Sequence, residues 1–172
     1  MSDFAELLGV NTEQNLRFFV ESLQEVPLPN GASDDELFYV ASVLAHYAIV
    51  SRFDPAYLSM GSLSEILDTF ILGGLLRPEP LITSDSEILE IAGSHTLLLV
   101  GFFRDQMRRR HNVGWFDELG QSFYDKASDG SSGKKRAVLQ RVAGHFPSWA
   151  LTCNAMRRRF RDNYYVLRNN EG

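Results

Sequence analysis

Residues 84–110 read SDSEILEIAGSHTLLLVGFFRDQMRRR and contain the longest largely apolar run of the chain, between His95 and Arg104. The segment opens with a capping box: Ser84 can accept the amide proton of Glu87, whose side chain reaches back to the Ser84 amide. Apolar residues then recur at helical spacing, and arginines close the segment, where they complement the helix dipole. The pattern predicts a long, buried helix over residues 85–110. Its apolar run is much shorter than the roughly 20 residues of a membrane helix, so we expect no membrane association.

Two further capping boxes, at residues 33–36 and 62–65, indicate other helix starts. The first predicts a central helix over residues 34–51, and the second a helix that Gly73–Gly74 ends. After Pro147, apolar side chains recur at alternating spacings of three and four and predict a third long helix over residues 147–167. Residues 128–133, SDGSSG, predict an exposed loop.

The chain has 172 residues, enough for one hydrophobic core, and no stretch alternates apolar and polar residues as a strand does. The roughly 40 residues after the 128–133 loop are too few for a second core. We therefore predict a single all-α domain over residues 1–172, built as an orthogonal or up-down bundle of roughly six to eight helices.

One cysteine, Cys153, permits no disulfide within the chain. The first ten residues carry Asp3 and Glu6 and lack the basic start and long apolar core of a signal peptide. Both features favour a cytoplasmic location.

Charge is distributed unevenly between the two halves of the chain. Residues 1–93 hold 15 acids and three arginines, a net charge of −12, whereas residues 94–172 hold 14 basic and seven acidic residues, a net charge of +7. Such an asymmetry indicates either complementary faces or a basic surface for an anionic partner.

The cations of the second half are the strongest candidates for a binding site, because guanidinium groups hold carboxylates and phosphates through paired hydrogen bonds. The candidates for binding an anion or a partner are Arg104, Arg108, Arg110, Lys134, Arg136, Arg157, Arg158 and Arg161. They could instead complement a helix dipole, or pair with first-half acids within the chain or across a dimer. Nucleic-acid binding is a further reading, which the acidic pI of about 5.3 disfavours.

Catalytic signals are weak. His95 and His46 lie among apolar helix neighbours, where burial could tune a histidine for acid–base chemistry or simply keep it neutral in the core. Cys153 lies mid-helix on an apolar stripe, which indicates a packed thiol. The sequence has no Glu-x-x-His pair, glycine-rich phosphate loop or nucleophile elbow, so we predict no metal site and no cofactor.

Residues 98–124 place Gly101-Phe102-Phe103 at the end of an apolar helix, then the pairs Trp115-Phe116 and Phe123-Tyr124 on either side of Gly120. This pattern resembles one found in helical bacterial proteins of unassigned function. The resemblance implies that residues 95–124 form the centre of the domain, and it implies no activity.

Together these features predict a non-catalytic cytoplasmic interaction or regulatory domain. We expect it to self-associate or to use its basic second half against an acidic partner protein. Two alternatives stay open at this point. The chain could be an enzyme or sensor that binds an anionic small molecule with a histidine near arginines, or it could bind nucleic acid.

Overall fold

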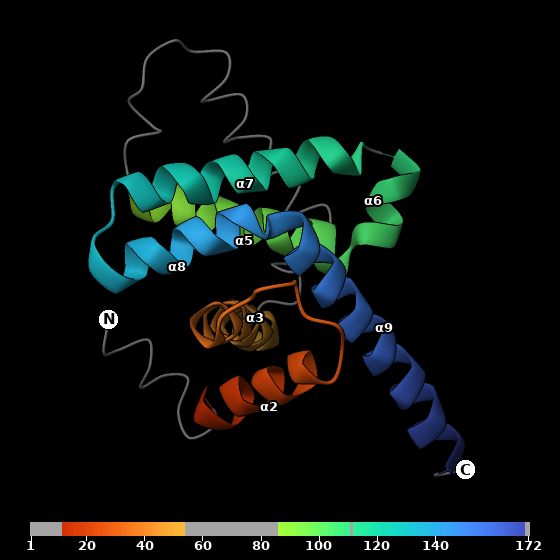
Figure 1. Ribbon diagram of the computed structural model, residues 1–172. Helices are drawn as coiled ribbons and strands as arrows, with labels where there is room; N and C mark the ends of the chain where they lie inside the picture. The colour runs from red at the N-terminus through yellow and green to blue at the C-terminus, as the bar shows by residue number, and fades with distance from the viewer. Residues whose placement is uncertain (1–11, 54–85, 111, 171–172) are drawn as a thin grey trace.

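The computed structural model describes residues 12–53, 86–110 and 112–170, and the regular structure within these ranges is entirely helical (Figure 1). This confirms the predicted all-α class. The helices are α2 (Thr12–Gln24), α3 (Asp34–Phe53), α5 (Ser86–Phe102), α6 (Arg104–Arg110), α7 (Val113–Asp129), α8 (Gly133–Gly144) and α9 (Phe146–Asn170). The capping box at 62–65, the stop at Gly73–Gly74 and the first two residues of the 84–87 box lie outside the described residues.

Helix α5 is the centre of the fold. Every residue from Ala92 to Gly101 is buried, and α5 packs against both α7 and α9 (Figure 1). A helix covered on several sides needs apolar residues around most of its circumference, which explains the run in the sequence. Within the described residues, no helix is both long and apolar enough to cross a membrane.

The predicted helix 85–110 is interrupted at Phe103, where the chain turns and α6 leaves in a new direction (Figure 1). The guanidinium of Arg157 in α9 donates to the carbonyl oxygen of Phe102 and lies 5.3 Å from the centre of the Phe103 ring. Phe102 is the last residue of α5, so Arg157 provides a donor for a carbonyl at the helix end.

Two glycines of the aromatic–glycine pattern allow close helix packing. A Cβ atom on Gly101 would lie 2.8 Å from Cβ of Cys153 in α9, and one on Gly120 would lie 2.1 Å from Cζ of Phe146. The pattern therefore serves helix–helix contact, and residues 95–124 do contribute the central α5–α7 pair.

The capping box predicted at the start of α3 is present. The Ser33 hydroxyl accepts the Glu36 amide proton at 3.3 Å, and the Glu36 carboxylate accepts the Ser33 amide at 2.7 Å. Helix α2 packs against α3, and this pair contacts the rest of the protein through α3 on α8, through α2 on α9 and through side-chain contacts such as Tyr39 of α3 with Glu90 of α5 (Figure 1).

The predicted 128–133 loop is shorter in the structure. Helix α7 continues to Asp129, Ser128 is fully buried within it, and α8 begins at Gly133, so that three residues make the connection. The Ser86 hydroxyl donates to the Ala127 carbonyl at 2.6 Å and thereby holds the start of α5 against the end of α7. Pro147 lies in the first turn of α9, where a missing amide proton costs little.

Candidate functional site

The predicted cations are divided among α6, α8 and α9, and most of those with described side chains contact oxygen atoms of the same chain. Arg108 and Arg136 are exposed to solvent. Arg110 and Arg161 belong to α6 and α9, and their side chains are outside the described residues.

Arg104 has a structural position. Its guanidinium lies 3.3 Å from Oδ2 of Asp117 in α7 and donates to the carbonyl of Val100 at 3.1 Å. Both charged side chains are only 11% exposed. Because an incoming anion would have to replace Asp117 at a poorly accessible position, Arg104 is the least suited of the candidates to bind a partner.

The α9 cations lie closer to solvent. Arg158 pairs with Asp105 at 3.0 Å, and its side chain is 56% exposed. Arg159, a neighbour of the binding candidates in the same arginine cluster, pairs with Glu25 at 3.1 Å and is 45% exposed. Exposed ion pairs of this kind contribute about 0–1 kcal/mol, so they can exchange partners at low cost.

Several pairs join the acidic first half of the chain to its basic second half. Lys134 lies 3.6 Å from Asp35, and Lys135 lies 2.9 Å from Glu90. The pair of Arg159 and Glu25 follows the same pattern. Part of the charge asymmetry is therefore compensated within one chain, as one of the sequence alternatives expected.

An apolar groove lies beside the α9 cations, between the α2–α3 connection and α9, and we name it the α9 groove. Its volume is about 330 Å³, and five of its eight described lining residues are apolar; the lining consists of Pro27, Leu28, Pro29, Asn30, Ser148, Leu151, Thr152 and Ala155. Leu28 is 38% exposed and Leu151 is 52% exposed. The Thr152 hydroxyl lies 2.9 Å from the Pro27 carbonyl, which fixes the connection against the helix.

The catalytic candidate His95 and the thiol of Cys153, which the sequence indicated to be packed, are both poorly placed for chemistry. His95 is 2% exposed and its ring packs on Tyr47, with 5.0 Å between ring centres. Burial first, and the charge of His46 second, lower the pKa of His95 to about 4. Burial also raises the pKa of the Cys153 thiol to about 12, which disfavours the thiolate.

His46 differs from His95 because it is exposed and lines a pocket of about 390 Å³ between α3 and α5. We name this the α3–α5 pocket; its lining includes Tyr39, Ser42, His46 and Tyr47 from α3, and Glu90 and Ser94 from α5. Arginine is not among its described lining residues, so the predicted pairing of a histidine with arginines is not found at this pocket.

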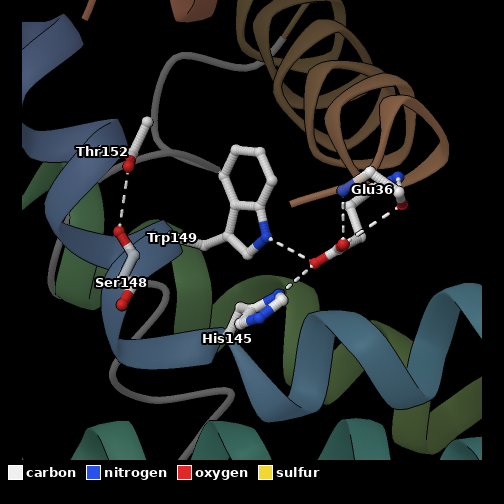
Figure 2. A network of polar contacts seen from close by, with 6 residues as sticks. Glu36, His145, Ser148, Trp149 and Thr152 are labelled. Carbon is white, nitrogen blue, oxygen red and sulfur yellow. Dashed lines mark hydrogen bonds and ion pairs between the residues drawn. The ribbon is translucent and has the colours of Figure 1, made fainter. Parts of the chain in front are cut away.

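A buried polar network that the sequence pattern did not predict surrounds Glu36 (Figure 2). The Glu36 side chain is 0% exposed, and its Oε1 atom accepts from His145 Nδ1 at 2.6 Å and from Trp149 Nε1 at 3.3 Å. Burial by itself raises the pKa of Glu36, but the hydrogen bonds that it accepts, the one from His145 first, outweigh burial and lower the pKa below 4.5. The capping box identified Glu36, but its remote partners leave no local signal.

The Glu36 network is better suited to joining helices than to chemistry. In Figure 2, the His145 and Trp149 side chains both point from the α8–α9 junction toward the first turn of α3. An ionised carboxylate can only accept hydrogen bonds. Nδ1 of His145 is therefore the donor in its hydrogen bond with Glu36. Full enclosure of the carboxylate leaves no access for a substrate.

Comparison of the chain with protein-family models, curated proteins and solved structures finds no match. Among the residues that the structure describes, no three His, Cys, Asp or Glu side chains gather closely enough to hold a metal ion. Among the residues that the structure describes, the α9 groove and the α3–α5 pocket are both open to a ligand.

Proposed function

We propose that this chain is a non-catalytic helical interaction domain that binds an acidic, amphipathic helix of a partner protein in the α9 groove. The observation that carries the proposal is the exposure of Leu28 and Leu151 on opposite walls of that groove. Helix-in-groove recognition requires exposed apolar walls of this kind, into which a partner inserts its anchor side chains.

The groove continues directly into the α9 cations. Leu151, Ala155 and Arg158 follow one another at spacings of four and three, so they share one face of α9. Seven residues of helix correspond to roughly 10 Å, which places Arg158 about two turns beyond Leu151. A partner helix with an apolar anchor and an acidic residue about two turns away fits this layout.

The intrachain pairs favour a protein partner over nucleic acid. Arg158 and Arg159 each already lie beside one carboxylate, so the charges of these two arginines are compensated within the chain. Nucleic-acid binding depends on several uncompensated cations along one face. A single acidic helix needs only to exchange one or two exposed pairs.

The groove can be tested with a displayed library of random short peptides, selected against the whole chain. We expect the selected peptides to combine apolar residues at helical spacing with Asp or Glu. Leu151→Asp should abolish their binding, and the double change Arg158→Glu with Arg159→Glu should weaken it about tenfold. Arg136→Glu, an exposed charge reversal on α8, is the matched control and should leave affinity unchanged.

Peptides without acidic residues, or equal binding by the Leu151→Asp variant, would refute the proposal. Sedimentation velocity of the same variants tests whether the partner is a second copy of this chain. A dimer that Leu151→Asp dissociates means that a second copy of the chain supplies the helix.

We also propose that the protein is located in the cytoplasm, which the free thiol of buried Cys153 supports.

A further inference from the structure

The α3–α5 pocket is a second site, formed by residues that the α9 groove does not use. Its volume of about 390 Å³ lies in the usual range of about 300–1,000 Å³ for small-molecule sites. Tyr39, Ser42 and His46 recur at helical spacing on α3, and Glu90 and Ser94 lie one turn apart on α5. Two rigid helices therefore present polar groups to one shared space.

Glu90 is the one carboxylate among the described lining residues, and two neighbours orient it. The Tyr39 hydroxyl donates to its Oε1 atom at 2.8 Å, and Lys135 Nζ lies 2.9 Å from its Oε2 atom. A carboxylate has about four acceptor positions, so each oxygen keeps one for a further donor. The Glu90 side chain is 19% exposed, which leaves it accessible and partly shielded from water.

The other walls of the pocket suit a cation that carries an apolar group. Tyr39 and Tyr47 contribute aromatic rings, although Tyr47 is only 4% exposed, and aromatic rings attract cations. Val43 and Ile91 provide apolar contact. Among the described lining residues there is no lysine or arginine, and Lys135, which pairs with Glu90, is 60% exposed, so a cation that binds from the pocket can replace it at the carboxylate at low cost.

We propose that the α3–α5 pocket binds a small organic ammonium cation, with Glu90 as its charge partner and Tyr39 and Tyr47 as its aromatic walls. The Ser94 hydroxyl, 2.8 Å from the Tyr124 hydroxyl, lies on the α5 side of the pocket and offers a further polar contact. This proposal is independent of the α9 groove, since the two sites share no lining residue.

Three probes of similar shape separate the effect of charge from that of the ring: benzylammonium, benzyl alcohol and benzoate. Each is titrated into the whole chain and followed by the backbone amide NMR signals of residues 39–47 and 90–94. We expect benzylammonium to shift these signals and to bind about fivefold or more tightly than benzyl alcohol. Benzoate should bind more weakly than either.

The variant Glu90→Gln tests the charge partner, and Glu118→Gln, an exposed acid on α7, is its control. We expect Glu90→Gln to remove the preference for benzylammonium while it retains benzyl alcohol binding, which also shows that the pocket is intact. Glu118→Gln should preserve the preference. Equal binding of benzoate and benzylammonium, a preference unchanged by Glu90→Gln, or the absence of shifts with every probe would overturn the proposal.

Discussion

The Nδ1 atom of His145 lies 2.6 Å from Oε1 of Glu36, although 109 positions separate the two residues in the chain. The same glutamate caps α3 through Ser33 and accepts the indole proton of Trp149. One buried carboxylate therefore completes the start of α3 and attaches it to the α8–α9 junction.

Glu36→Gln should lower the free energy of unfolding by about 2–4 kcal/mol, because the amide supplies donors where only acceptors fit. Glu21→Gln, on the exposed face of α2, should change it by less than about 0.5 kcal/mol. Urea unfolding at neutral pH measures both. The pKa of Glu36 is lowered below 4.5 in the folded chain, so its contribution is complete above pH 4.5 and is lost as pH falls through the folded value. Equal stability of the two variants would contradict the assigned role.

His95 should make the free energy of unfolding depend on pH at higher pH values than Glu36 does. Its pKa falls from 6.5 in the unfolded chain to about 4 in the folded one, so between these values only the unfolded chain binds the proton. The free energy of unfolding should therefore decrease by about 2 kcal/mol between pH 7 and pH 5 through this residue. Denaturant titrations of a His95→Gln variant should show a correspondingly smaller decrease. If that variant loses as much stability over the same range as the parent chain, another group is responsible.

Gly120→Ala should destabilise the protein by about 3 kcal/mol, because the added methyl group would overlap the buried ring of Phe146. Gly144→Ala is the matched control, since a Cβ atom there meets nothing within 4 Å. In a helix this change should stabilise the protein by about 0.5 kcal/mol. Thermal unfolding of the two variants measures the difference, and similar melting temperatures would show that α7 and α9 can separate freely.

Arg104 and Arg158 should differ in their contribution to stability, although each pairs with an aspartate. Arg104→Gln should cost about 2–3 kcal/mol, because it leaves Asp117 uncompensated at 11% exposure. Arg158→Gln should cost less than about 0.5 kcal/mol, because its pair with Asp105 is solvated. Double-mutant cycles with Asp117→Asn and Asp105→Asn measure the two couplings. Couplings of equal size would remove the distinction between structural and binding arginines.

Local patterns in the sequence predicted those structural features that are determined by residues close together in the chain. The Ser33–Glu36 capping box, the buried α5 segment and the start of α9 near Pro147 all follow from residues within a few turns. The contact of Arg157 with the Phe102 carbonyl at the end of α5 could not be predicted in this way, because it joins two distant helices.

In the candidate sites, too, the sequence predicted individual residues but not the contacts between distant helices. The sequence identified exposed cations such as Arg158 and the histidine of the α3–α5 pocket, His46. It could not identify which cations pair within the chain, or that Leu28 and Leu151 share one groove. Those relationships depend on how α2, α3 and α9 pack, and a helical pattern specifies only which face of each helix is apolar.

The position of Glu36 has a consequence for the order in which the protein can fold during synthesis. Its partners His145 and Trp149 leave the ribosome more than a hundred residues after it. Until then, the Glu36 carboxylate in the first turn of α3 has hydrogen bonds only from Ser33 and from water. Because its other acceptor positions need water, this turn stays hydrated. A nascent chain that stops before α9 therefore cannot bury this carboxylate, and the first turn of α3 completes its packing only with the last part of the chain.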